Sequence, residues 1–365
     1  MKRVIIAAFV ILAAVMLGLF FINDKAPEID VTAQKTPVGV LLNGSRMDGS
    51  YCQTHYEALE AIKDELNLQI LYRDNIVGDE TCYDEIVDLI EQYGCRIIVA
   101  VSFQFGEYMT RAAETYPDVY FFHATGTNRL NNLSTYFGRM YQVRYLSGIV
   151  AGLRTETGHL GYVAAFPISE VIRGINAFAE GVRSVREDAV IHVKYSDSWT
   201  EDDLAGNAGT ELFDKYPIDV MSLHTDSLRP IEEADKRGIW SVGYNLDQSE
   251  RFPDTYLTAC VWHWEVYYRE QILKCLQDKF HGSHDWINME EGIAGLSPLT
   301  ENAAEGSREA VRKAEELLLS RTYDVFYGPI RDNEGNIRIE DGDSMPDDEM
   351  LNRFDWYVEG VLVEE

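Results

Sequence analysis

The sequence has few cysteines and few basic side chains. Its 365 residues include five cysteines, whose spacing matches no CxxC pair and no zinc-ligand pattern. Cys52 and Cys82 follow neighbouring predicted strands, and they either pair with each other or remain small buried thiols. Lysine and arginine number 32 against 61 aspartates and glutamates, a formal net charge of −29. Because nucleic acid repels a chain of this charge, we expect no nucleic-acid partner.

The signature motifs of common enzymes are also missing. The sequence contains no phosphate-binding P-loop, no GxSxG nucleophile elbow, no HExxH zinc motif and no glycine fingerprint for a dinucleotide. His281 and His284 lie close together but have no third ligand at metal-binding spacing. The sequence therefore predicts a protein that is not an enzyme and that holds no metal or cofactor.

One long hydrophobic run is present, at the N-terminus. Val4 to Ile22 carry no charged or polar side chain, and Lys2 and Arg3 precede them. A helix that spans a bilayer needs ~20 such residues, whereas the core of a signal peptide has ~7–15. The basic residues predict that this end stays in the cytoplasm. We therefore interpret residues 1–35 as a membrane anchor with a linker, and a cleaved signal segment is the alternative.

Strand-like and helix-like segments alternate through the rest of the chain. Pro37–Leu42 is a β-rich run followed by a helical pattern, and Leu133 to Val182 reads as strand, helix, strand and helix. Glu301–Ser320 is predicted as one long helix. This order is typical of parallel sheets covered by helices. The sequence predicts an α/β fold of two αβα lobes joined by a hinge, with residues 36–138 and 262–284 in lobe 1 and residues 139–261 and 285–365 in lobe 2.

Aromatic and acidic side chains follow many of the predicted strands. In open parallel sheets, ligands bind beyond the carboxyl ends of the strands. A flat base stacks on aromatic rings, and a carboxylate accepts hydrogen bonds from its N–H groups. The pattern therefore predicts a nucleobase pocket, and the candidate ligand-binding residues are Asp48, Tyr51, Ser102, Phe103, Phe166, Trp199, Tyr244, Asp247, Trp262 and Trp264.

Some of these residues have a structural alternative. Asp247 can cap a turn, and Phe166 can pack at the hinge. If a helix begins between Trp262 and Trp264, only one of the two faces the pocket and the other lies in the core.

Several motifs resemble the basic-membrane-protein family of substrate-binding lipoproteins. They are YLSGIVAGLRTETGHLGYV, FPISEVIRGINAFAEG, DSW at 197–199, HTDS at 224–227, GYNLD at 243–247 and VWHWEVYY at 261–268. The resemblance covers almost everything after residue 36. It implies the type I periplasmic-binding-protein fold and a purine nucleoside receptor that feeds an ABC permease. The tryptophan motifs resemble a branch of the family that takes adenine or a related purine.

The N-terminus departs from this family's pattern. The family usually carries a lipid-modified cysteine just after its signal, but the first cysteine here is Cys52. We therefore expect a protein held at the cell membrane by its N-terminal helix, with its lobes on the extracellular or periplasmic side. The predicted function is purine binding for an ABC importer. A purine-sensing receptor or regulatory module of the same fold is the alternative.

Overall fold

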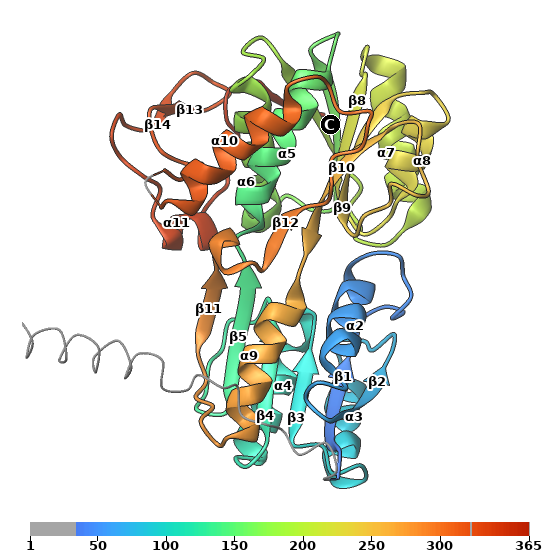
Figure 1. Cartoon of the computed structure of the whole chain (residues 1–365), viewed down its shortest axis with the longest axis vertical. Coiled ribbons are helices and arrows are strands. Elements are labelled where there is room, and N and C mark those ends of the chain that lie inside the picture. The colour runs from blue at the N-terminus through green and yellow to red at the C-terminus, as the bar shows by residue number, and fades with distance from the viewer. Residues whose placement is uncertain (1–33, 322, 365) are drawn as a thin grey trace, which may run out of the picture.

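The computed structural model describes residues 34–321 and 323–364, which form two α/β lobes stacked end to end (Figure 1). The predicted membrane anchor lies outside these residues. Within them, no helix has both the length and the apolar character to cross a membrane. The five cysteines are buried free thiols, which answers the question that their spacing left open.

Lobe 1 contains a six-stranded sheet in the order β11-β5-β4-β3-β1-β2, in which all neighbouring strands are parallel. Its strands are β1 (Thr36–Leu41), β2 (Leu68–Arg73), β3 (Ile97–Ala100), β4 (Tyr120–Ala124), β5 (Leu133–Gly138) and β11 (His284–Ile287). Its helices are α2 (Tyr51–Ile62), α3 (Glu80–Glu91), α4 (Gly106–Thr115) and α9 (Trp264–Leu276). β11 extends this sheet beyond residue 284, where the sequence placed the end of the lobe.

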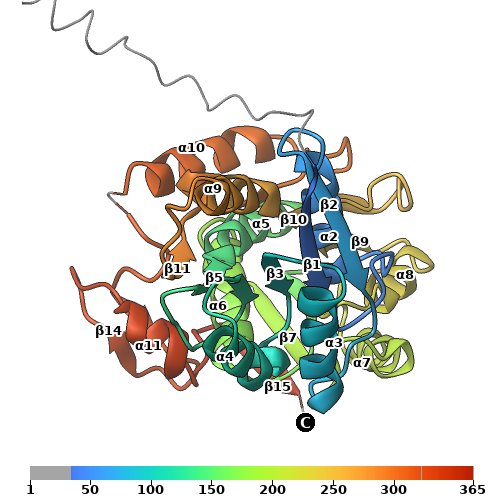
Figure 2. The ribbon, with the colours of Figure 1, turned by 90° about the horizontal axis from the view of Figure 1, so that it is seen from below.

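The alternating direction of side chains along the lobe 1 strands explains why helices cover both faces of the sheet. Val38 and Val40 point into the core shared with α2 and α9, whereas Leu41 points into the core shared with α3 and α4. Successive strand residues face opposite sides, so a strand covered on both sides is apolar throughout. Figure 2 shows the sheet of lobe 1 from its end, between these two helical layers.

Lobe 2 contains a seven-stranded sheet in the order β12-β10-β9-β8-β6-β7-β15, in which only β12 is antiparallel to its neighbour among the described strands. Its strands are β6 (His159–Ala164), β7 (Val190–Tyr195), β8 (Val220–His224), β9 (Trp240–Asn245), β10 (Tyr256–Trp262), β12 (Ala294–Leu296) and β15 (Val361–Glu364). Its helices are α5 (Met140–Arg154), α6 (Ser169–Arg183), α7 (Asp202–Lys215), α8 (Arg229–Asp235), α10 (Ser307–Leu319) and α11 (Asp347–Asn352).

The predicted helix at 301–320 begins later than expected. α10 starts at Ser307, after Gly306 in the left-handed conformation with φ 87°. The residues before it form turns in which Asn302 Nδ2 donates to the carbonyls of Pro253 (2.9 Å) and Tyr256 (3.0 Å). These tertiary hydrogen bonds hold the segment out of the helix.

Helices α5 and α6 pack against each other at very short range. A Cβ atom on Gly148 would lie 2.2 Å from the Phe178 carbonyl oxygen, and one on Gly181 would lie 2.0 Å from the Tyr145 carbonyl oxygen. Only glycine permits this approach of the two backbones. The pair fixes the start of α6 at the carboxyl edge of the lobe 2 sheet, opposite lobe 1.

The chain crosses between the lobes in three places, which form the hinge. β5 leads into α5, β10 leads into α9, and the segment after β11 leads through the short helix η2 (Met289–Glu291) to β12. These crossings lie side by side between the lobes in Figure 1.

Candidate ligand-binding site

The carboxyl ends of the strands in both lobes meet at the cleft. Ser50, at the start of α2 in lobe 1, touches Asp226 and Asn245 of lobe 2. Asn245 Nδ2 donates to Ser50 Oγ (2.8 Å) and to Asp226 Oδ1 (2.8 Å), and Ser50 Oγ donates to Asp226 Oδ1 (3.3 Å). Gln248 Nε2 donates to the Gly49 carbonyl (3.1 Å). These bonds close the lobes on each other on this side.

Aromatic rings from both lobes lie near the place where the lobes meet. In lobe 2, Phe166 and Trp199 are half-buried and meet edge to face at 6.1 Å, and Trp199 lies 6.0 Å from His224. Tyr244 packs against the same histidine at 4.9 Å. In lobe 1, the Tyr51 hydroxyl donates to the Val101 carbonyl (3.0 Å).

The two aromatic groups lie close enough to influence each other's titration. Burial raises the pKa of Tyr51 well above its usual value, and the nearby Tyr136, Tyr244 and Glu170 raise it further. Tyr244 and Glu170 belong to lobe 2, so Tyr51 lies beside the lobe 2 side of the cleft.

Three of the seven described non-glycine residues with positive φ lie at strand ends near this cleft. Thr125 after β4, Asp197 after β7 and Asn245 at the end of β9 have φ values of 58°, 54° and 69°. Non-glycine residues avoid this left-handed region, and a β-branched threonine is especially unfavourable there. Such strain is often found where side chains are held for function.

Two carboxylates that the sequence analysis did not select lie in the cleft. Burial, and then the neighbouring Asp48, raise the pKa of Asp226 to about 7, against hydrogen bonds from Asn245 and Ser50 that lower it. Glu170 lies in the first turn of α6, with Oε1 3.6 Å from His224 Nε2. Both belong to motifs quoted above, HTDS and FPISEV. Asp226 follows β8 directly, where the strand-end rule applies, whereas nothing in the local pattern separates Glu170 from the chain's many other carboxylates.

A hollow of about 330 Å³ opens beside Glu170, between the lobes. We call it the cleft hollow, and its lining includes Thr125, Phe137, Glu170, Arg173, Trp286 and Asn352. Its size is at the lower end for pockets that hold small molecules. It combines aromatic faces with charged and hydroxyl groups, as a flat polar ligand requires.

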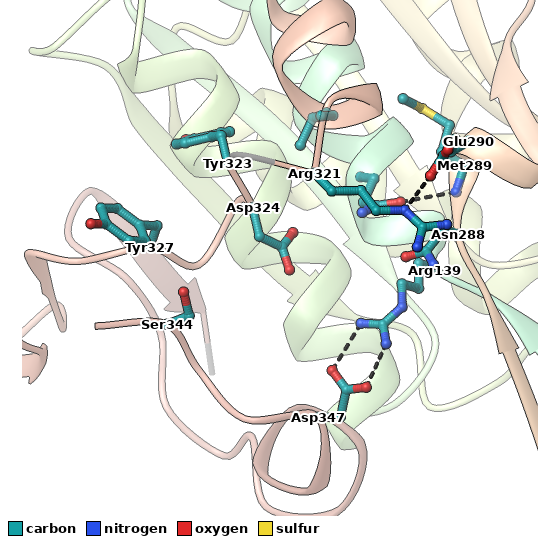
Figure 3. Close-up of a pocket in the computed structure, with 12 residues that line it drawn as sticks. Arg139, Asn288, Met289, Glu290, Arg321, Tyr323, Asp324, Tyr327, Ser344 and Asp347 are labelled. Carbon is teal, nitrogen blue, oxygen red and sulfur yellow. Dashed lines mark hydrogen bonds and ion pairs between the residues drawn. The ribbon is translucent and has the colours of Figure 1, made fainter. Parts of the chain in front are cut away.

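Two other hollows are present, and the first of them also lies between the lobes and reaches Asn245. One of about 420 Å³ lies between α2 and the ends of β9 and β10, and Asp247 and Trp262 line it. The other, of about 330 Å³, lies behind the hinge at the start of α5 (Figure 3). In Figure 3 Arg139 is paired with Asp347, with Nη1 2.9 Å from Oδ1, and Arg321 is paired with Glu290.

Several residues chosen from the sequence have structural partners instead of a free face. Asp48 is exposed and caps α2, since its carboxylate accepts from the backbone N–H groups of Ser50 (2.8 Å), Cys52 (3.0 Å) and Gln53 (3.1 Å). Asp247 caps a turn by accepting from the Ser249 N–H (2.9 Å).

The two tryptophans of VWHW stack on each other at 4.2 Å. Trp264 begins α9, is fully buried, and donates from Nε1 to Thr54 Oγ1 (3.0 Å). Trp262 donates to Asn245 Oδ1 (3.1 Å). Trp264 therefore supports the wall behind Tyr51 from the core, while Trp262 positions Asn245.

The residues that follow β3 contribute little enclosed surface to the cleft. Phe103 is 65% exposed, and buried Ser102 accepts a hydrogen bond at its carbonyl from His123 Nε2 (2.8 Å). Of the predicted set, Tyr51, Phe166, Trp199 and Tyr244 lie near one another where the lobes meet, although none of the four lines the cleft hollow. Their role in ligand binding stays a prediction.

A family model described as ABC transporter substrate-binding protein PnrA-like matches residues 35–323. The chain belongs to the Bmp family. This family comprises substrate-binding proteins rather than enzymes.

A purine-binding protein of Brucella abortus is 30% identical over 332 residues, which are 90% of this chain and 93% of that protein. A putative ABC transporter glucose-binding protein of Haloferax volcanii is 29% identical over 86% of this chain and 77% of its own length.

Solved structures confirm the type I periplasmic-binding-protein fold predicted for this Bmp protein. An ABC transporter solute-binding protein of Aeropyrum pernix superposes with a TM-score of 0.68 at 18% identity, covering 81% of this chain and 93% of that one. A transcriptional activator of the comK gene from Bacillus halodurans superposes with a TM-score of 0.70 at 22% identity, covering 78% and 99%.

Proposed function

We propose that this Bmp protein binds a purine nucleobase or nucleoside, adenine-like in its hydrogen bonding, and delivers it to an ABC permease on the outer side of the cell membrane. The observation that carries the proposal is the group of aromatic rings where the lobes meet, with Tyr51 from lobe 1 and Phe166, Trp199 and Tyr244 from lobe 2. Stacking on such rings contributes about 1–3 kcal/mol per base. Closure of the lobes on the ligand would bring both sets of rings to it.

The buried carboxylate supports the same ligand class. At neutral pH, Asp226 is close to half-protonated, because its pKa is about 7. A protonated carboxyl donates one hydrogen bond and accepts others, and an ionised one only accepts. Purine edges carry donors and acceptors side by side, and Asp226 can match either kind of group.

A thermal-shift panel tests the proposal. The purified protein is heated with adenine, adenosine, hypoxanthine, glucose, ribose and several amino acids. A ligand at about 100 times its Kd adds ~2.7 kcal/mol to the free energy of unfolding. We expect the purines to raise Tm and the other compounds to leave it unchanged. Glucose is the decisive control, because the Haloferax volcanii relative is named as a putative glucose-binding protein. A response to glucose without a response to purines would refute the proposal.

A sensing role is the second candidate. A Bacillus subtilis relative, 22% identical over 72% of this chain, is named as the transcriptional activator protein med. The chain also lacks a cysteine between residue 22 and Cys52 to which lipid could be attached. Uptake of labelled adenine by cells with and without the protein separates the two roles. Import predicts that uptake falls in the deletion strain, whereas sensing predicts unchanged transport activity and altered gene expression.

A further inference from the structure

Glu170 has a carboxylate whose hydrogen-bonding capacity is unused within the described part of the chain. It lines the cleft hollow from the first turn of α6, and its side chain is 27% exposed. The polar group nearest to it is His224 Nε2, at 3.6 Å. At this distance the two groups do not form a hydrogen bond. Both carboxylate oxygens are therefore open to a group that enters from the hollow.

Positive charge is gathered behind this carboxylate. Arg144 is fully buried in lobe 2 and donates from Nη1 to the Leu223 carbonyl (2.7 Å). Its Nε and Nη2 atoms, and both ring nitrogens of His224, have no hydrogen-bond partner among the described residues. Arg173, one turn along α6 from Glu170, is also buried and donates to the Met350 carbonyl (2.6 Å). The start of a helix adds a further partial positive charge.

These groups keep Glu170 ionised although it lies in a buried environment. Burial would raise its pKa, but His224, Arg173 and Arg144 together hold the pKa of Glu170 below its usual value. Burial lowers the pKa of His224 to about 4, and Arg144 contributes to this shift. At neutral pH the pair is thus a carboxylate beside a neutral imidazole.

The remaining titratable groups that face Glu170 carry no permanent charge at neutral pH. Tyr51 from α2 and Tyr244 from β9 are neutral near pH 7, because burial raises both pKa values well above their usual range. Asp226, beyond the end of β8, differs from Glu170 in that it gains and loses its proton near pH 7. Two carboxylates whose surroundings separate their pKa values in this way commonly have different roles.

We propose that Glu170 is a specificity-determining residue, whose carboxylate accepts a hydrogen bond from an N–H group of the bound base, and that His224 and Arg144 act through it as positioning residues. The inference rests on the proposed function, because it assigns an atom-level role at the same cleft. A carboxylate has no proton to donate. A base that turns a bare ring nitrogen or an alkylated amine toward Glu170 would leave that charge unpaired, which is strongly unfavourable in a buried site.

The test combines one isosteric variant with ligands that lack single donors. E170Q keeps the shape of the side chain and removes its charge. E180Q is the matched control, because Glu180 lies on the same helix ten residues further on, about 15 Å along its axis at 1.5 Å per residue. Affinities for adenine, 9-methyladenine and N6,N6-dimethyladenine are measured by calorimetric titration at pH 7.5 with wild type and both variants.

We expect E170Q to weaken adenine binding about 10- to 100-fold, the range for a hydrogen bond to a charged group. E180Q should remain within about twofold of wild type. One of the two methylated ligands should bind wild type as weakly as adenine binds E170Q, and should lose nothing further in E170Q, since the same hydrogen bond is missing in both cases.

The possible failures are distinguishable. If wild type binds no purine, both the proposed function and this inference are refuted. If wild type binds adenine and E170Q binds it equally well, or if E170Q weakens all three ligands by one common factor, the inference alone is refuted.

His224 is tested separately through the pH dependence. In H224N, the carboxylate of Glu170 loses a neighbour that lowers its pKa, so the affinity relative to wild type should fall as the pH is lowered. A loss that is the same at every pH would show a purely structural effect of His224 and would remove it as a positioning residue.

Discussion

Removing the Trp199 indole should weaken ligand binding much more than it weakens the fold. Trp199 is half-buried at the margin of the core, and among the described aromatic rings its indole contacts Phe166 and His224 at about 6 Å between ring centroids. Its structural hydrogen bonds use the backbone: the Trp199 carbonyl accepts from Thr225 Oγ1 (2.7 Å) and from the Asp226 N–H (2.8 Å). W199A keeps these bonds. Loss of a stacking contact of about 1–3 kcal/mol corresponds to a ~5–150-fold loss of affinity.

Trp264 provides the matched control, because it is a tryptophan of the same site region that lies in the core. It is fully buried and packs on Trp262 and His55 at 4.2 and 4.6 Å. Truncation of such a residue costs about 3–5 kcal/mol of unfolding free energy. W199A should therefore melt cooperatively without ligand and bind adenine at least roughly tenfold more weakly, while W264A should lose stability first.

The assay is a calorimetric titration with adenine and a melt without ligand on the same preparations. Wild-type affinity in a well-folded W199A would remove this residue from the site and would contradict the reasoning from the aromatic cleft. A large loss of stability in W199A, with affinity intact once the variant is folded, would show that the indole is a packing residue.

Three further predictions concern other parts of the molecule. The full-length protein should fractionate with membranes and retain Met1–Ile22, and mass spectrometry that finds a mature N-terminus after residue 22 would contradict this. Because Asp226 keeps its proton up to a pH of about 7, whereas an unfolded aspartate releases it near pH ~4, the folded state binds more protons in that window. The free energy of unfolding should therefore decrease as the pH rises from 4 to 7, and denaturant titrations of D226N should lack this part of the decrease. G148A should lower the free energy of unfolding by about 1–3 kcal/mol, because its Cβ would lie 2.2 Å from the Phe178 carbonyl oxygen, and a wild-type denaturation midpoint would refute this account of the α5–α6 contact.

The order of strands and helices could be predicted from the sequence because it depends on local periodicity. Val38 and Val40 share one side of β1, and Gly39 and Leu41 share the other, so a buried parallel strand is visible in six residues. The position of the aromatic residues after strands also predicted where the cleft would be, since parallel strands end at one edge. Tyr51, Phe166, Trp199 and Tyr244 were selected by that rule, and their role in ligand binding stays a prediction.

Local pattern did not decide which of these side chains have a free face. Trp262 and Trp264 lie two residues apart, and their directions depend on the residue at which α9 begins. The structure ends β10 at Trp262 and starts α9 at Trp264, which places the second ring in the core. The capping bonds of Asp48 and Asp247 likewise follow from turns whose geometry the surrounding structure sets.

The charged part of the site was decided by the tertiary structure alone. Glu170, His224 and Arg144 come from α6, β8 and α5, and they meet because β8 pairs with β6, the strand that leads into α6. Each is an ordinary polar residue in its own segment. Their effect arises when burial removes water from around them, because charges then act on one another through a medium of lower dielectric constant.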